Sequence, residues 1–190
     1  MARVLVINGI IISNGALLKD AAVVIEGGRI KAVEKRPKPG KDCKTIDAGG
    51  LFVSPGFIDT HIHGDPEKVF SSEVRYGTTS ILPAISCADD HSIAESVTRI
   101  KAFIKKGPYG QNVLGVRVEG PFISRQRAGA QDPRYIRDPD GEVLARVVKA
   151  CGGFLKIMTV APELKGAAAL IKAIRKKGII ASIGDRKSVV

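Results

Sequence analysis

From Phe52 onward, apolar runs typical of strands alternate with amphipathic segments typical of helices, and this alternation limits the possible folds more than any other feature of the sequence. Strands that alternate with helices favour a parallel sheet or barrel whose faces the helices cover. A closed (β/α)8 barrel needs about 200 residues at the least, and the 190-residue chain provides fewer than that after Phe52. We therefore predict an α/β fold in which about five strands form an incomplete (β/α)8 TIM-type barrel. The expected strands are the run that ends at His63 and residues 78–84, 113–119, 155–160 and 178–183, and the expected helices cover 66–76, 92–106, 143–150 and 166–177.

The first 52 residues have a different pattern, in which short apolar runs are separated by glycine turns. Gly27-Gly28 lies between two of these runs and indicates a two-residue hairpin, because glycine tolerates the positive φ that such turns need. We predict a small β module over residues 1–52, followed by the barrel portion over 53–184. The expected strands of the module are 3–7, 10–12, 22–26, 29–33 and 44–47.

Two of the three histidines, His61 and His63, lie in the first strand of the barrel portion. Side chains alternate between the faces of a strand, so both imidazoles project to one face while Ile62 projects to the apolar side. Gly64-Asp65-Pro66 ends the strand, which places the histidines at its C-terminal end, where parallel α/β proteins have their active sites. Two imidazoles there can bind one divalent metal; the alternative is a half-exposed strand with two surface histidines.

Glu119 ends another expected strand and is followed by Gly120-Pro121, so its carboxylate is expected at the same end of the sheet. A carboxylate in that position completes a His/His/Glu set of the catalytic kind, which leaves a coordination position for water. The alternative is an ion pair with Arg117, two positions earlier on the same face of the strand.

Five motifs in chain order make the sequence similar to N-acetylglucosamine-6-phosphate deacetylases, members of the amidohydrolase superfamily. The first motif indicates only the superfamily, whereas the glutamate motif and the Gly-Ala-Gln loop after it are more specific. The resemblance implies a metal-bearing (β/α)8 barrel with a small β-sandwich built from both chain ends, so residues 1–52 would be the N-terminal portion of that sandwich. The motifs are PGFIDTHIHG at 55–64, GTTS at 77–80, VEGPFI at 118–123, GAQ at 129–131 and APE at 161–163.

The resemblance also implies a metal site and a reaction. His61, His63 and Glu119 would bind the metal, for which zinc or iron is the usual candidate, and Ala130 and Gln131 would contact the sugar. A divalent ion lowers the pKa of its bound water and polarises a carbonyl. The implied reaction is therefore hydrolysis of N-acetylglucosamine 6-phosphate to glucosamine 6-phosphate and acetate. The family forms homodimers in which one arginine of the phosphate site comes from the neighbouring subunit, so a homodimer is expected of the full-length protein.

Alternatives remain for the loop and for the function. The loop that contains Ala130 and Gln131 fits an ordinary surface loop equally well, since it carries the arginines 125, 127, 134 and 137. Another amidohydrolase, such as a cyclic-amide hydrolase of the dihydroorotase type, would be expected to carry a modified lysine at the end of strand four. Lys156 lies near the start of that strand, which favours the deacetylase. The remaining alternative is a non-catalytic fragment that binds a metal or a partner.

The sequence departs from the family at three places. The segment between His63 and Gly77 is shorter than usual, Arg117 stands where many members have histidine, and Asp185 follows Gly184 where the family has a metal-binding histidine. His91 is no substitute, because it lies at the start of an expected helix, where a solvated or capping role is the simplest interpretation.

The family's second barrel histidine, on strand six, and its general acid/base, an aspartate on strand eight, have no counterpart in this sequence. We therefore assign no catalytic residue and expect the isolated chain to be inactive, although the parent protein is expected to be an enzyme. Residues 185–190 read Asp-Arg-Lys-Ser-Val-Val. A common sequencing adapter encodes these residues in frame, so we suspect a non-native tail on a truncated gene model.

Composition excludes several classes of partner. The net charge is +11, but the basic residues cluster toward the ends of two expected helices and aromatic residues amount to 5%. Base stacking needs aromatic side chains, so no nucleic-acid partner is expected. No apolar run approaches the roughly 18 residues of a membrane span, and the N-terminus does not resemble a signal peptide. The three cysteines are far apart, which favours reduced thiols and a cytoplasmic location.

Overall fold

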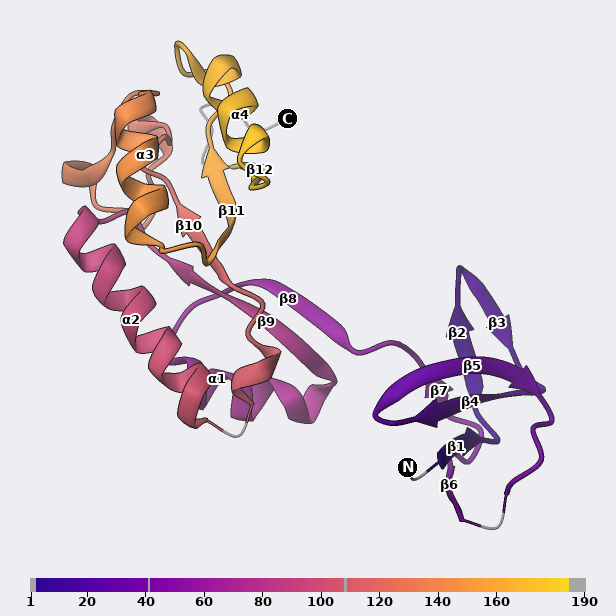
Figure 1. The fold of residues 1–190 in the computed structure, drawn as a ribbon. Coiled ribbons are helices and arrows are strands. Elements are labelled where there is room, and N and C mark those ends of the chain that lie inside the picture. Colours follow the sequence, from indigo (N-terminus) through magenta and orange to yellow (C-terminus); the bar gives the residue numbers. More distant parts are fainter. Residues whose placement is uncertain (1–2, 41, 108, 185–190) are drawn as a thin grey trace. The chain divides into compact units, whose positions relative to one another are not determined.

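A computed structural model describes residues 3–40, 42–107 and 109–184. The chain divides between Pro55 and Gly56 into two compact units (Figure 1). The suspected tail at 185–190 lies outside the described residues. No helix in the described part of the chain is long and apolar enough to cross a membrane.

The first unit is built from two small sheets. The larger sheet has the order β5-β4-β1-β6, and the smaller has the order β3-β2-β7. Gly27 and Gly28 have positive φ and join β4 to β5 in the predicted hairpin. Leu5, Ile11 and Val24 are fully or almost fully buried and form its core. The strands are β1 (Arg3–Ile7), β2 (Ile10–Ser13), β3 (Ala16–Leu18), β4 (Ala21–Glu26), β5 (Arg29–Lys35), β6 (Cys43–Asp47) and β7 (Phe52–Val53).

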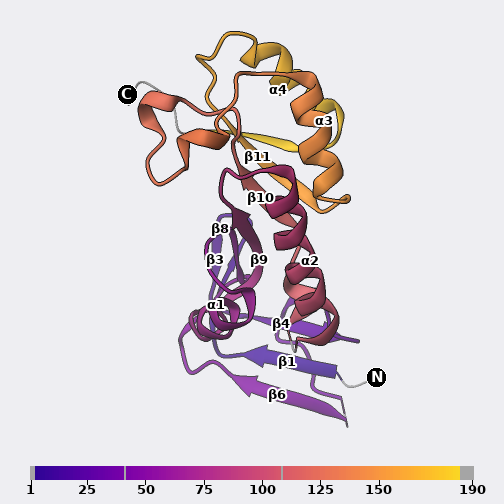
Figure 2. The same ribbon diagram turned by 90° about the vertical axis from the view of Figure 1, so that its left-hand side faces the viewer.

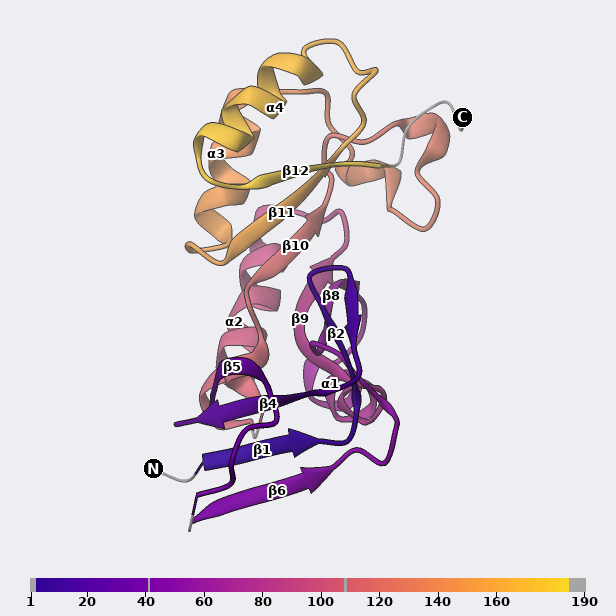
Figure 3. The same ribbon diagram turned by 90° about the vertical axis from the view of Figure 1, so that its right-hand side faces the viewer.

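The second unit contains a sheet of five parallel strands in the order β12-β11-β10-β9-β8. Each strand therefore pairs with the next one along the chain, as in a barrel that has not closed. Figure 3 shows β10, β11 and β12 side by side. The strands are β8 (Phe57–Ile62), β9 (Thr78–Ile85), β10 (Val116–Glu119), β11 (Leu155–Val160) and β12 (Ile180–Ile183).

Four α-helices follow the first four of these strands, and each contacts the next helix along the chain (Figures 1 and 2). In α2 the buried residues Ile93, Val97 and Ile100 recur at the spacing of one helix face. This face packs with strand residues such as Val116 and Val118 in the main hydrophobic core. The helices are α1 (Pro66–Glu73), α2 (Asp90–Lys106), α3 (Gly141–Ala150) and α4 (Ala167–Lys176).

The strand β10 is shorter than the sequence predicts. It begins at Val116, because Gly115 has a φ of 150° and the pairing with β11 shifts between Val116 and Arg117. Val113 keeps only an isolated bridge to Ile81. Within β10, Val116 and Val118 enter the core beneath the helices, so Arg117 and Glu119 project to the opposite face of the sheet, where the histidines also lie.

Candidate metal centre

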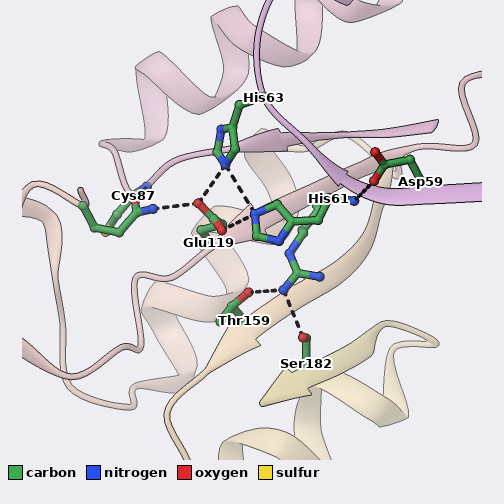
Figure 4. Close-up of polar contacts among 9 residues, drawn as sticks. Asp59, His61, His63, Cys87, Glu119, Thr159 and Ser182 are labelled. Atoms are coloured by element: carbon green, nitrogen blue, oxygen red, sulfur yellow. Dashed lines mark hydrogen bonds and ion pairs between the residues drawn. The ribbon is translucent and has the colours of Figure 1, made fainter. Parts of the chain in front are cut away.

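The two histidines lie at the C-terminal end of β8, as predicted. The strand ends at Ile62, which packs against the core, so His61 and His63 project away from it. The backbone N–H of His61 donates to Asp59 Oδ1 at 2.8 Å, which fixes the chain just before the pair (Figure 4). After His63, Gly64 has a φ of 120° and Asp65 caps α1. The histidine pair is therefore held between a strand end and a helix start.

Glu119 is the last residue of β10, and its side chain meets both imidazoles. His61 Nε2 lies 2.5 Å from Glu119 Oε1, and His63 Nε2 lies 3.2 Å from Glu119 Oε2 (Figure 4). The two Nε2 atoms are 3.3 Å apart. The Glu119 side chain is 8% exposed, whereas the histidine side chains are 43% and 50% exposed. A buried carboxylate thus faces two imidazoles that remain accessible from solvent.

These three side chains have the donor set of a divalent metal site. One ligand atom from each lies within 4.8 Å of the others. Two imidazole nitrogens and one carboxylate oxygen suit zinc and iron, and three protein ligands leave a position open for water. Within the described part of the chain, this is the one group of three or more histidine, cysteine or acidic residues whose ligand atoms converge in this way. The residues present therefore fit the predicted divalent metal.

Gln131 reaches the same cluster from the loop between β10 and α3, a contact that the sequence did not predict. Its Nε2 donates to Glu119 Oε2 at 2.6 Å, and its Oε1 accepts from the backbone N–H of Cys87 at 2.7 Å. The neighbouring residue Ala130 is exposed and makes no such contact among the described residues. The loop thus places Gln131 against a predicted metal ligand and leaves Ala130 facing solvent.

Two exposed arginines of this loop, Arg125 and Arg137, also stabilise it through hydrogen bonds to its backbone. Arg125 donates to the carbonyls of Pro133 and Ile136, at 2.8 Å and 2.7 Å. Arg137 donates to the carbonyls of Arg134 and Ile136, at 2.6 Å and 2.9 Å. The bonds tie residues 125–137 into a defined conformation, so Gln131 is presented by a braced segment.

The alternative in which Arg117 pairs with Glu119 is wrong for the described structure. Arg117 Nη2 donates instead to Thr159 Oγ1 at 2.9 Å and to Ser182 Oγ at 3.0 Å, on the neighbouring strands β11 and β12 (Figure 4). No ion pair joins Arg117 to a carboxylate in residues 3–40, 42–107 and 109–184. The two side chains share a face of β10 but turn toward different neighbours.

The other candidate residues lie away from this cluster. His91 is in the first turn of α2, its side chain is 83% exposed, and its Nε2 lies 3.4 Å from Glu95 of the same helix. The cap of this helix is Asp89, so His91 is solvated rather than capping. Lys156 is the second residue of β11 and exposed, at the end of the sheet opposite the histidines. A lysine of the dihydroorotase type is therefore not supplied by this strand.

Comparison with known proteins agrees with these features. The chain is 32% identical to the N-acetylglucosamine-6-phosphate deacetylase of Bacillus subtilis, over 97% of this chain and 51% of that protein. It is 30% identical to the human N-acetylglucosamine-6-phosphate deacetylase, over 96% of this chain and 49% of that protein. No model of a protein family matches the chain. The chain spans about half the length of the curated relatives that it matches.

Solved structures give the same result. The N-acetyl-D-glucosamine-6-phosphate deacetylase of Mycobacterium smegmatis, a mutant in complex with N-acetyl-D-glucosamine-6-phosphate, matches with a TM-score of 0.78 and 25% identity, over 99% of this chain and 51% of that one. The Thermotoga maritima enzyme of the same name matches with a TM-score of 0.72 and 28% identity, over 96% of this chain and 48% of that one. The predicted incomplete (β/α)8 barrel is thus confirmed. The chain is therefore similar to N-acetylglucosamine-6-phosphate deacetylases along almost its whole length, and it spans about half the length of these proteins.

Proposed function

We propose that this chain is the metal-binding portion of an enzyme that hydrolyses N-acetylglucosamine 6-phosphate to glucosamine 6-phosphate and acetate. The observation that carries the proposal is the convergence of His61, His63 and Glu119 at the C-terminal ends of β8 and β10. It gains support from the similarity to deacetylases along almost the whole chain.

In this proposal His61, His63 and Glu119 hold a divalent metal, for which we favour zinc or iron. Such an ion lowers the pKa of bound water toward about 7 and polarises the amide carbonyl of a substrate. The chain's own contribution is to place the ligands before the metal arrives. Burial of Glu119 and the bond from Gln131 restrict the carboxylate, and the end of β8 restricts the histidines. Ligands held in this way lose little freedom on binding.

We propose that Ala130 and Gln131 contact the amino-sugar phosphate. The amide nitrogen of Gln131 has two N–H groups and uses one of them on Glu119, so the second remains available to a substrate hydroxyl or carbonyl. Ala130 offers an exposed backbone beside it. A substrate bound there would lie next to the proposed metal, which is where its acetamido group must be.

The protein that contains this chain is proposed to act on this small molecule as a homodimer in the cytoplasm, where its free thiols Cys43, Cys87 and Cys151 would stay reduced. Nothing in the proposal requires a nucleic acid or a membrane. By the same resemblance, the general acid/base is an aspartate that these 190 residues do not supply. We therefore expect metal binding, but no acetate release, from the chain by itself.

The test is metal binding to the chelator-treated chain. Zn²⁺ binding is measured by calorimetry, and Co²⁺ binding is measured from its visible absorption spectrum. We expect one ion per chain with wild type, and a loss of affinity of about a hundredfold or more when His61 or His63 is replaced by alanine, since a catalytic-type site has only three protein ligands. His91→Ala is the matched control, because His91 also lies near a carboxylate but outside the cluster. Equal effects of the three replacements would refute the proposed site.

A further inference from the structure

Arg117 is a buried cation that forms no ion pair with an acidic residue in the described part of the chain. The residue is 9% exposed and lies on the inner face of the five-stranded sheet, the face that carries Glu119. Its acceptors are the hydroxyls of Thr159 and Ser182, both bonded to Nη2. Its Nε is buried and has no hydrogen-bond partner among the residues that the structure describes. A charged side chain is almost never buried in this way unless an anion or a full set of acceptors compensates it.

The neighbouring carboxylate does not provide the compensation. Glu119 uses its two oxygens on His61, His63 and Gln131. Among the described residues, no other aspartate or glutamate forms an ion pair with the guanidinium. The arginine therefore keeps a buried donor on Nε for which the described residues offer no acceptor.

The hydroxyls of Thr159 and Ser182 both contact the guanidinium of Arg117. Thr159 and Ser182 are paired in register on β11 and β12, so their side chains project to the same face as each other. Thr159 is 2% exposed, so its hydroxyl is held among buried neighbours. Each hydroxyl accepts from Nη2 and still has its own O–H to donate. A cation with an unused Nε–H donor and two hydroxyls that can donate suit a small anion with two oxygens, because a charge-assisted hydrogen bond from Nε to a carboxylate would compensate the buried guanidinium.

We propose that Arg117, Thr159 and Ser182 form a binding site for a small carboxylate on the inner face of the sheet, beside the His61/His63/Glu119 cluster. Acetate is the carboxylate to use as a probe, and this choice rests on the proposed function, in which acetate is a product. The carboxylate site itself is inferred from the buried guanidinium of Arg117 and does not require that function.

The experiment is a titration of the metal-free 190-residue chain with acetate in the presence of a chelator, at constant ionic strength set with chloride. The readout is the ¹H–¹⁵N signal of the Arg117 Nε–H group, because a carboxylate that compensates the guanidinium shifts this resonance. We expect a saturable shift with acetate and none with chloride. In Arg117→Gln, which lacks this signal, acetate binding is measured instead from the line broadening of the acetate methyl resonance, in parallel with wild type. We expect the acetate affinity to fall about tenfold or more, since a charge-assisted hydrogen bond is lost.

Arg99→Gln is the matched control, because Arg99 is an exposed arginine of α2 that donates to Ser96 Oγ. It is expected to leave acetate binding unchanged. Should Arg117→Gln fail to fold, the pair Thr159→Val with Ser182→Ala keeps the cation and removes both hydroxyls, and it is expected to weaken acetate binding while the Nε–H signal remains. Equal responses to acetate and chloride, or full affinity without Arg117 or the hydroxyls, would overturn the site.

Because the acetate titration is made on the metal-free chain, its result can be distinguished from a test of the proposed deacetylase function. Acetate binding by the metal-free chain does not depend on His61, His63 or Glu119 as ligands. A chain that binds metal but gives no saturable acetate shift refutes the carboxylate site alone. A chain that binds acetate through Arg117 but no metal refutes the deacetylase proposal alone.

Discussion

Gln131 Nε2 donates a 2.6 Å hydrogen bond to Glu119 Oε2, although the two residues lie on different elements and 12 positions apart. The orientation of the amide is fixed at its other end, where Gln131 Oε1 accepts from the backbone N–H of Cys87. Because that N–H can only donate, the amide nitrogen must face the carboxylate. Gln131 therefore holds one oxygen of Glu119 and leaves Oε1, the atom nearest His61, as the oxygen for a metal.

Replacing Gln131 by alanine is expected to lower the metal affinity of the chain by about tenfold, because residues that orient metal ligands typically contribute 10- to 100-fold. Zinc calorimetry on the chelator-treated chain measures this loss, and urea unfolding without metal measures any change in stability. Gln126→Ala is the control, since Gln126 lies in the same loop and is exposed. If Gln131→Ala binds zinc as tightly as wild type, Glu119 does not need the hydrogen bond from Gln131 in order to bind the metal.

Gly120 sets the direction of the chain immediately after Glu119. It has a φ of 91°, and a Cβ added there would lie 3.2 Å from Cys87 Sγ. Gly153 also has positive φ, at 82°, but a Cβ there would meet nothing within 4 Å. Alanine at either position is expected to cost about 1–2 kcal/mol of unfolding free energy from backbone strain. The extra contact at Gly120 should make that variant the less stable of the two.

The same pair of variants also tests the metal site. Gly120→Ala is expected to weaken metal binding, because relief of its contact with Cys87 displaces the adjacent Glu119 and the Gln131 bond. Gly153→Ala should bind metal as wild type does. Urea unfolding and zinc calorimetry on both proteins give the comparison. Equal metal affinities would mean that the cluster tolerates movement of this turn.

Much of the fold could be predicted from periodicity, because it follows from local patterns. The alternation of strands and helices predicted all five parallel strands and the four helices between them. Two strands were missed, β3 and β7, which have three and two residues. The Asn14-Gly15 turn, with positive φ at both residues, was the available signal for β3.

The site was predictable only in part. Strand ends predicted that His61, His63 and Glu119 lie together, since this needs only alternation along β8 and β10. The partners of Arg117 could not be predicted, because they depend on the rotamer of a long side chain and on the register of β11 with β12. The role of Gln131 depends on the course of a loop, which periodicity does not describe. The departures from prediction at the site thus lie where a long side chain reaches another strand, as at Arg117, or where a loop brings one in, as at Gln131.

Phe70 attaches α1 to the rest of the second unit. It is the one buried residue of that helix, is 0% exposed, and lies with its ring centre 5.2 Å from that of Tyr109. Phe70→Ala is expected to lower the free energy of unfolding by about 3–5 kcal/mol, the usual cost of a phenylalanine-sized cavity. Tyr76→Ala, at a residue 77% exposed, should change it little. Thermal and urea unfolding of both variants provide the measurement, and similar stabilities would contradict the packing described.

The thiols predict how stability responds to alkaline pH. Burial raises the pKa of Cys87 to about 11 and that of Cys151 to about 12, from an ordinary value of 9.0. Above pH 9 the unfolded chain loses these protons while the folded chain keeps them, so the folded state binds more protons and stability falls as pH rises toward 11–12. Below pH 9 this contribution is fully present. Urea unfolding at a series of pH values should show the decline, and it should be smaller in a Cys87→Ala, Cys151→Ala double variant.

The same burial predicts which thiol reacts first. A protonated, buried thiol is a poor nucleophile, so Cys87 and Cys151 should react with a disulfide reagent at about pH 8 only as fast as the second unit opens. Cys43 is half-buried in the first unit and should react first. Mass spectrometry after short labelling identifies the modified residue. Rapid labelling of Cys87 would show that the chain around Cys87 opens in the native state. The 2.7 Å hydrogen bond from Cys87 N–H to Gln131 Oε1 would then break often, and Gln131 would hold Glu119 less firmly than this bond implies.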